Sequence, residues 1–150
     1  MKKRLRILLA DDDKDDRFFF EKALKTLPTQ TELFSVEDGE KLMTYLLKNI
    51  TNLPDVLFLD INMPRKNGSE CLQEIKRHGK LKEIPVVMYS TSLHEDVADL
   101  LHCYGASYYI QKTDFTFLPN LIDKALRMII TDKNTHPERK EFILTVNNFA

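Results

Sequence analysis

Short runs of apolar residues recur along the chain, each bounded by polar or turn-forming residues. The clearest is Val56–Leu59, four consecutive apolar residues bracketed by Pro54 and Pro64. A run without polar alternation is typical of a strand that is buried on both faces, as in a parallel sheet. We therefore predict five strands, at Leu5–Ala10, Glu32–Val36, Val56–Leu59, Pro85–Ser90 and Tyr108–Gln111.

The stretches that follow these runs carry apolar residues three and four positions apart, the spacing of a helix with one buried face. Asp13 can cap the first helix, with Asp16 at its third position. Strands that alternate with helices predict an α/β fold, with a parallel sheet covered on both faces. The predicted core stripes are Phe20, Ala23, Leu24 and Leu27; Leu42, Met43, Leu46 and Leu47; Cys71, Leu72 and Ile75; Leu93, Val97, Leu100, Leu101 and Tyr104; and Leu118, Leu121, Ile122, Ala125 and Ile129.

The helical spacing stops at Thr131. Residues 131–140 are polar, and Phe142–Val146 is apolar and rich in residues that favour strands. Three alternatives stay open for this segment: an added strand, an arm that packs on the domain or on a second subunit, and a disordered tail. We predict one domain over residues 1–130 and a C-terminal extension over residues 131–150.

Composition limits the classes of protein to consider. The 150 residues are 43% apolar and 30% charged, with a formal net charge of −1, so nothing indicates a nucleic-acid partner. The apolar run Ile7–Ala10 is too short for a signal peptide, and no run approaches a membrane span, so we predict a cytoplasmic protein. Cys71 and Cys103 fall in predicted helices and are expected to be free, buried thiols. The four histidines lack the spacing of metal ligands.

Polar residues that suit phosphoryl chemistry follow the predicted strands. Asp11 and Asp12, Asp60, Ser90 and Lys112 stand at four strand ends, which lie at one edge of a parallel sheet. Two carboxylates at ~4 Å repel by about 4 kcal/mol at an effective dielectric near 20, and a hard cation such as Mg²⁺ offsets that cost. A lysine and a hydroxyl can then bind a transferring phosphoryl group, with an aspartate as its nucleophile.

At this point the sequence resembles the receiver domain of two-component response regulators. The resemblance covers roughly Leu5 to Ile130 and implies a flavodoxin-like fold with strand order 2-1-3-4-5. It rests on four motifs with family order and spacing: Ile7-Leu8-Leu9-Ala10-Asp11-Asp12-Asp13; Asp60-Ile61-Asn62-Met63-Pro64 with Gly68; Pro85-Val86-Val87-Met88-Tyr89-Ser90; and Gly105-Ala106-Ser107-Tyr108-Tyr109-Ile110-Gln111-Lys112.

The resemblance also implies a role for each acidic residue. Asp60 matches the phosphoacceptor. Asp12 and Asp60 match the carboxylates that bind Mg²⁺ directly, with Asn62 contributing its backbone carbonyl and Asp11 acting through water. Asn62 matches, in addition, a position at which receivers tune the lifetime of the phosphoryl-aspartate.

A second group of matches implies a conformational switch. Ser90 matches the hydroxyl that bonds the phosphoryl group, Tyr109 the aromatic residue that turns inward with it, and Lys112 the lysine that pairs with the phosphoryl group; Ser92 is a second lifetime position. New negative charge would pull the hydroxyl and the lysine inward. Thr113 departs from the family, in which a proline with a cis bond follows the lysine; a cis bond before threonine costs roughly 2.5–4 kcal/mol.

Two other readings compete with a phosphorylated receiver. A haloacid-dehalogenase-type phosphatase also uses a strand-end aspartate, but it needs an acid where this chain has Asn62, and its metal-binding acidic pair comes late in the chain, unlike Asp11 and Asp12. A pseudo-receiver would keep the fold and bind partners without phosphorylation. All five matched side chains are present, which favours the receiver.

The predicted function is therefore a stand-alone receiver that takes a phosphoryl group from a histidine kinase or a phosphotransfer protein and contacts a downstream protein. Its only predicted enzymatic steps act on its own aspartate. Phe18 and Phe19 of the first helix are too many apolar residues for one buried face with Phe20, so they are one candidate contact surface. Phe117 and Met128 of the fifth helix are another, and a homodimer through that helix is a hypothesis.

Overall fold

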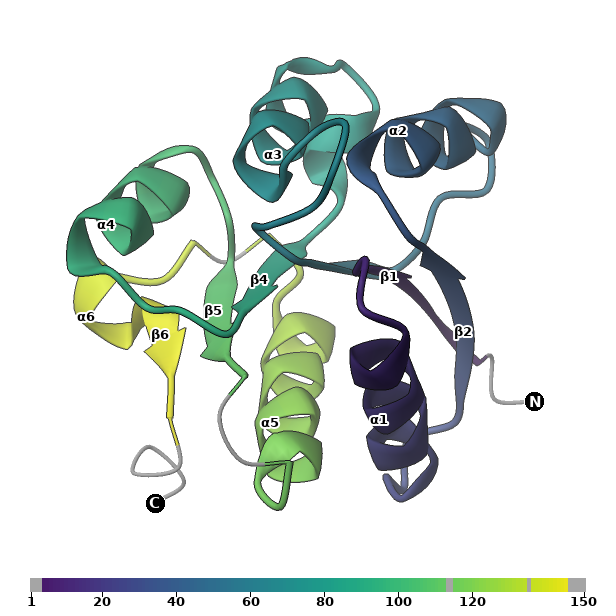
Figure 1. Cartoon of the computed structure of the whole chain (residues 1–150), viewed down its shortest axis with the longest axis vertical. Helices are drawn as coiled ribbons and strands as arrows, with labels where there is room; N and C mark the ends of the chain where they lie inside the picture. Colours follow the sequence, from purple (N-terminus) through teal and green to yellow (C-terminus); the bar gives the residue numbers. More distant parts are fainter. Residues whose placement is uncertain (1–3, 113–114, 135, 146–150) are drawn as a thin grey trace.

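A parallel sheet of six strands forms the centre of the computed structural model, which describes residues 4–112, 115–134 and 136–145 (Figure 1). The strand order is β2-β1-β3-β4-β5-β6, so the predicted order 2-1-3-4-5 is confirmed, with one further strand beside β5. Every neighbouring pair is parallel. The strands are β1 (Leu5–Ala10), β2 (Thr31–Val36), β3 (Val56–Leu59), β4 (Val86–Ser90), β5 (Tyr108–Gln111) and β6 (Ile143–Leu144).

Helices cover both faces of the sheet. One face carries α1 (Lys14–Lys25) and α5 (Leu118–Thr131), and the other carries α2 (Gly39–Lys48), α3 (Gly68–Arg77) and α4 (Glu95–Cys103) (Figure 1). A short 3-10 helix (Leu81–Glu83) precedes β4, and α6 (Arg139–Phe142) precedes β6. None of the helices in the described ranges is long and apolar enough to cross a membrane.

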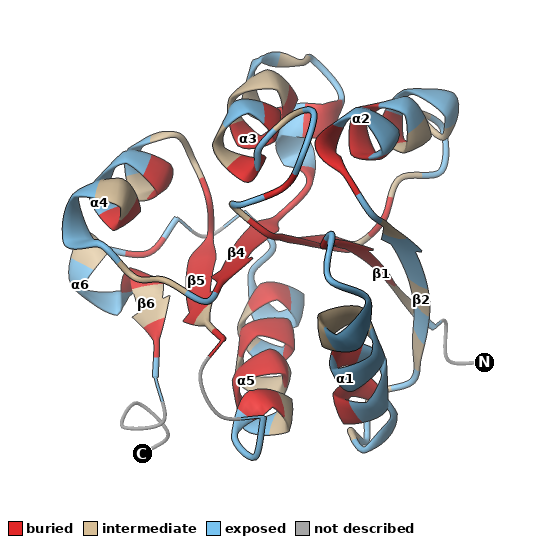
Figure 2. Cartoon of the chain, viewed as in Figure 1, coloured by how far each residue is buried: buried red, intermediate tan, exposed pale blue. Residues whose placement is uncertain are grey.

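The central strands are buried on both faces, as their apolar runs predict (Figure 2). Successive side chains point to opposite faces. In β1, Ile7 and Leu9 enter the core beneath α1 and α5, whereas Leu8 and Ala10 enter the core beneath α2, α3 and α4. The sheet thus separates two apolar cores, and each helix layer closes one of them.

Two predicted core positions are wrong. Leu47 in α2 is 47% exposed and Leu100 in α4 is 53% exposed. Each is adjacent to a buried leucine, and successive helix residues turn by about 100°, which takes these two side chains off the buried face. Phe18 and Phe19 are 59% and 37% exposed, which confirms that the triple phenylalanine is too wide for one face. The predicted burial is also wrong for Cys103, an exposed free thiol at the end of α4.

The C-terminal extension packs against α4 and β5. The guanidinium of Arg139 binds the carboxylates of Glu95 and Asp99, both at 2.6 Å. Phe142 is fully buried, with its ring centroid 6.3 Å from that of Tyr109. Of the three alternatives for this segment, the described residues form the added strand; Val146 lies outside them.

Candidate functional site

The backbone places three polar residues at one edge of the sheet. Asp11 directly follows β1. The N–H of Asp60 donates to the carbonyl of Ala10 at 2.9 Å, and the N–H of Lys112 donates to the carbonyl of Ser90 at 2.7 Å. These hydrogen bonds continue the pairing of the strands one residue beyond their ends. Asp11, Asp60 and Lys112 consequently leave the sheet side by side.

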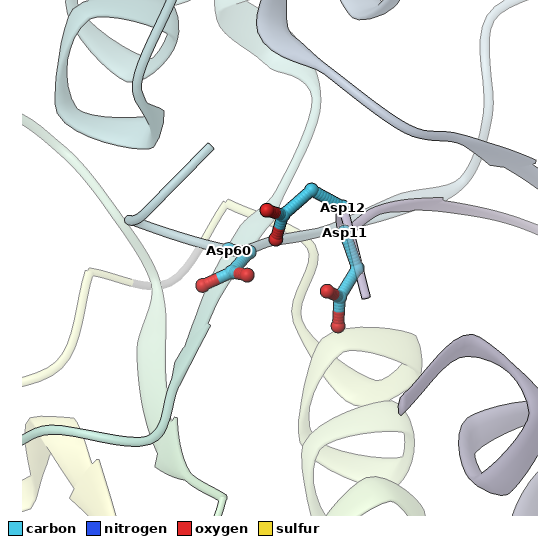
Figure 3. Close-up of side chains that lie close together, drawn as sticks. All are labelled: Asp11, Asp12 and Asp60. Carbon is cyan, nitrogen blue, oxygen red and sulfur yellow. The ribbon is translucent and has the colours of Figure 1, made fainter. Parts of the chain in front are cut away.

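The three predicted metal-binding carboxylates meet at this edge (Figure 3). Asp11, Asp12 and Asp60 each offer an oxygen, and these oxygens all lie within 4.8 Å of one another. Asp11 and Asp60 are buried, whereas Asp12 is exposed, so the cluster opens to solvent on one side. Hard oxygen ligands with an open side fit a Mg²⁺ ion that keeps several water molecules.

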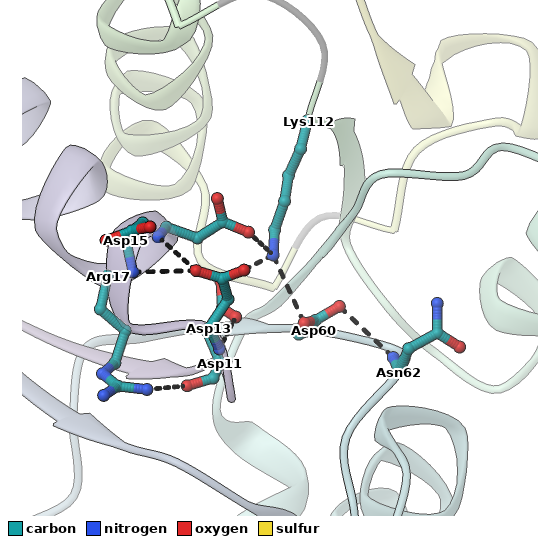
Figure 4. Close-up of polar contacts among 8 residues, drawn as sticks. Asp11, Asp13, Asp15, Arg17, Asp60, Asn62 and Lys112 are labelled. Carbon is teal, nitrogen blue, oxygen red and sulfur yellow. Dashed lines mark hydrogen bonds and ion pairs between the residues drawn. The ribbon is translucent and has the colours of Figure 1, made fainter.

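Lys112 inserts its ammonium among the carboxylates (Figure 4). Its Nζ lies 2.7 Å from Oδ2 of Asp11 and 3.3 Å from Oδ2 of Asp60. A third carboxylate oxygen, Oδ2 of Asp16, lies 3.0 Å away. Burial opposes the positive charge, but the carboxylates of Asp11, Asp60 and Asp16 outweigh it and raise the pKa of Lys112. The lysine therefore stays protonated and neutralises part of the acidic cluster.

The contact with Asp16 is one that the sequence did not predict. Asp16 was expected to complete the start of the first helix. Its N–H does accept that role, donating to the carboxylate of the helix-capping Asp13 at 3.0 Å, but its own carboxylate faces Lys112. The two residues are 96 positions apart, so no local pattern signals the pair.

Asp60 carries the most perturbed acidity of the cluster. Burial raises the pKa of its carboxyl to about 7; Lys112 opposes this shift, and the charge of Asp11 adds to it. The N–H of Asn62 donates to Oδ1 at 3.3 Å, while the Asn62 side chain points to solvent. A cation bound beside Asp60 would favour the ionised form, which is the nucleophilic one.

The loop after Asp60 depends on Gly68. The N–H of Gly68 donates to the carbonyl of Ile61 at 2.8 Å, which brings the start of α3 against the end of β3. A Cβ atom at this position would lie 2.1 Å from the carbonyl oxygen of Asp60. Only glycine permits so close an approach of backbone to backbone.

The predicted switch residues lie beside the cluster. The hydroxyl of Ser90 is buried and has no hydrogen-bond partner among the described residues. Tyr109 is 1% exposed, and its hydroxyl donates to the carbonyl of Ser92. The inward position of the tyrosine is therefore fixed by a backbone group in the segment after β4. The bond between Lys112 and Thr113 lies outside the described residues.

Tyr89 is a further residue that the sequence did not single out. It is fully buried, and the Nζ of Lys112 lies 4.6 Å from the centroid of its ring. The hydroxyl of Tyr89, like that of Ser90, has no partner in the described part of the chain. An aromatic residue inside a strand reads as ordinary core, which is why its sequence position carries no signal.

Comparison with known proteins places this arrangement in a family. The profile of the response regulator receiver domain matches residues 7–126. Response regulator Rcp1 of Synechocystis sp. is 39% identical over 94 residues, which cover 60% of this chain and 64% of Rcp1, just under two thirds of that protein. The probable methanogenesis regulatory protein FilR2 of Methanothrix harundinacea is 30% identical over 124 residues, 79% of either chain.

Solved structures agree with these matches. The phosphorylated cyanobacterial phytochrome response regulator RcpA superposes with a TM-score of 0.76 at 33% identity, covering 91% of this chain and all of that one. The Mn²⁺-bound form of Rcp1 gives a TM-score of 0.72 at 30% identity, covering 89% of this chain and 96% of that one. The similarity to RcpA extends over almost the whole chain.

Proposed function

Because the chain belongs to the response regulator receiver domain family, whose general function is phosphorylation on an aspartate, we propose that Asp60 is the phosphoacceptor of this protein. One observation carries the proposal: Asp60 shares its edge of the sheet with two other carboxylates and with the ammonium of Lys112. Asp11 and Asp12 crowd negative charge that a cation would neutralise, and the lysine supplies a fixed positive charge for a transferred group.

The proposed reaction moves a phosphoryl group from a phosphohistidine to Asp60. A carboxylate oxygen of Asp60 forms the new P–O bond while the P–N bond breaks, and the electron pair of that bond returns to the imidazole nitrogen. Lys112, at 3.3 Å from Asp60, then pairs with a phosphoryl oxygen. The unpartnered hydroxyl of Ser90 can donate to another.

Receiver domains bind Mg²⁺ or Mn²⁺ at an acidic cluster, as the Mn²⁺-bound Rcp1 structure illustrates. We assign Mg²⁺ to this chain, held by the carboxylates of Asp11, Asp12 and Asp60 and by the backbone carbonyl of Asn62. When bound, the ion neutralises charge on the phosphoryl oxygens. The cluster supports this assignment because hard oxygen donors with an open side suit this ion.

Receiver domains act with histidine kinases and with downstream targets, and an aromatic surface beside the site suits such a donor. Phe18, Phe19, Phe115 and Phe117 are all exposed, and the rings of Phe19 and Phe115 stack with centroids 4.4 Å apart. This surface flanks Lys112 from both α1 and the start of α5. We assign it to the kinase or phosphotransfer protein; RcpA is a phytochrome response regulator, so a photoreceptor kinase is the first donor to try.

The output is a contact with a downstream protein, through the surface that Ser90 and Tyr109 influence. The chain would act on no substrate beyond its own aspartate, in the cytoplasm, where free cysteines persist. Residues 1–130 would be the receiver unit and residues 131–150 an extension of it. A homodimer through α5 remains a hypothesis, which sedimentation of the phosphorylated and unphosphorylated protein would test.

Intact-protein mass spectrometry tests the acceptor. The protein is incubated with acetyl phosphate and Mg²⁺, or with a chelator, as wild type, Asp60→Asn and Asp55→Asn. Asp55 precedes the same strand at its opposite end and is the matched control; its carboxylate accepts from the N–H of Arg6 at 2.8 Å. We expect one added phosphoryl group in wild type and in Asp55→Asn, only with Mg²⁺, and none in Asp60→Asn.

Other outcomes would decide against the proposal in distinct ways. A folded wild-type protein that gains no phosphoryl group would be a pseudo-receiver. Steady loss of acetyl phosphate without an adduct, at a rate that Asp60→Asn does not change, would indicate hydrolysis elsewhere on the chain.

A further inference from the structure

The ammonium of Lys112 has two contacts outside the three-carboxylate cluster. On one side the ring of Tyr89 lies 4.6 Å from Nζ, within the range of a cation–π interaction. On the other side the carboxylate of Asp16 lies 3.0 Å away. The side chain of Lys112 is only 4% exposed, so these contacts are shielded from water and are stronger than the same contacts on a surface.

The packing of Tyr89 points to its ring rather than to its hydroxyl. The residue is fully buried in the core beneath α1 and α5, where its ring also meets that of Phe20 in a T-shaped contact at 5.7 Å. Its hydroxyl has no partner among the described residues, and such a group is destabilising when buried. Phenylalanine would fill the same space without that cost. What the tyrosine gives the site is the face of an aromatic ring beneath a cation.

Asp16 differs from the other carboxylates that contact Lys112. A cation held by Asp11 and Asp60 would compete for their charge and weaken their attraction to the lysine. Asp16 belongs to α1 and does not belong to the three-carboxylate cluster, so its charge stays available to Lys112 when the cluster is filled. The lysine side chain has a long, flexible stem and needs fixed partners to hold one position.

We propose that the ring of Tyr89 and the carboxylate of Asp16 form a seat for the ammonium of Lys112 and act as positioning residues for phosphoryl transfer to Asp60. The positioning role rests on the proposed function, whereas the seat itself does not. Both residues act through Lys112, since neither contacts Asp60. Losing either would let the lysine leave the position from which it reaches a phosphoryl oxygen.

The first experiment observes the seat without any phosphorylation. Protons on the lysine carbon next to Nζ lie over the aromatic ring and should resonate upfield of an ordinary lysine in the NMR spectrum, with Lys112→Arg identifying the signal. We expect the upfield shift to disappear in Tyr89→Leu and to persist in Tyr89→Phe. An ordinary shift in wild type, or an upfield shift that survives Tyr89→Leu, would overturn the seat.

The second experiment measures the rate of Asp60 phosphorylation by acetyl phosphate and Mg²⁺. We expect Tyr89→Leu and Asp16→Asn each to slow it about tenfold, the size of one contact of this kind. Tyr89→Phe should restore the rate lost in Tyr89→Leu. Asp15→Asn is the matched control, because Asp15 is an exposed acid in the same helical turn whose carboxylate faces solvent.

A double-mutant cycle separates positioning from general damage. If Tyr89 acts through Lys112, the effect of Tyr89→Leu disappears in a Lys112→Met background; a merely structural role predicts the same loss in both backgrounds. Unchanged rates in Tyr89→Leu and Asp16→Asn, with the NMR shift present in wild type, would overturn the positioning role. A wild-type protein that is never phosphorylated would refute the proposed function, and the NMR shift alone would then decide the seat.

Discussion

Replacing Asp60 by asparagine is expected to stabilise the protein when no metal is present. Asparagine has the same shape and can still accept the N–H of Asn62. Lys112 is not left unpaired, because Asp11 and Asp16 remain within 3.0 Å of its Nζ. The substitution thus removes one buried negative charge from a crowded cluster and changes little else.

The magnitude follows from the acidity of Asp60. Its pKa rises from 3.8 to about 7 on folding, mainly through burial. Each pKa unit corresponds to ~1.4 kcal/mol, so the ionised carboxylate destabilises the folded state by roughly 2–4 kcal/mol at pH 8. Below about pH 4 the group is protonated in both the folded and the unfolded state. The stabilising effect of neutral Asp60 is therefore complete at low pH and is lost as the pH rises through 7.

Urea unfolding in the presence of a chelator tests this prediction at pH 8, 6 and 4.5. Asp60→Asn should exceed wild type in unfolding free energy by roughly 2–4 kcal/mol at pH 8, and the difference should shrink toward pH 4.5. Glu32→Gln is the control, because Glu32 is exposed on β2, and it should stay within about 0.5 kcal/mol of wild type throughout. Equal stability at pH 8, or a difference independent of pH, would refute the reasoning. Added Mg²⁺ should stabilise wild type and leave Asp60→Asn unaffected.

Two further predictions concern packing. Phe142→Ala should lower the unfolding free energy by about 3 kcal/mol, because the ring is fully buried, whereas Phe18→Ala, at a ring that is 59% exposed, should cost under about 1 kcal/mol; equal losses in thermal or urea unfolding would contradict this. Gly68→Ala should lower both stability and the phosphorylation rate, since its Cβ would lie 2.1 Å from the carbonyl oxygen of Asp60. Gly79→Ala, with open space around the new atom, should be neutral by the same two measurements.

The sheet and its order could be predicted because their signals are local. Apolar runs such as Val56–Leu59 can be buried only between two layers, and the rest of the topology follows from alternation with helices. The end of the chain had no such signal. Its last strand, Ile143–Leu144, is two residues long, and only its pairing with β5 and the burial of Phe142 against Tyr109 define it. Those contacts join segments more than 30 residues apart, which a local pattern does not encode.

The site divides in the same way. Asp11, Asp60 and Lys112 could be brought together from sequence, because each follows a strand and parallel strands end at one edge. The contacts that hold the lysine from the side could not be predicted. Asp16 has the composition of a helix start and Tyr89 that of a core strand, and only the rotamers of the folded protein turn both toward Lys112.

The end of β4 connects the two sides of the sheet. Tyr89 and Ser90 are adjacent and point to opposite faces, since side chains alternate along a strand. Tyr89 lies in the core beneath α1 and α5 and contacts Lys112, whereas Tyr109 and Phe142 lie in the opposite core, beside the C-terminal extension. Any shift of Ser90 toward a phosphoryl group on Asp60 would move the strand residue next to it. The seat of Lys112 and the packing of the extension would then respond to the same displacement, because one short strand carries both.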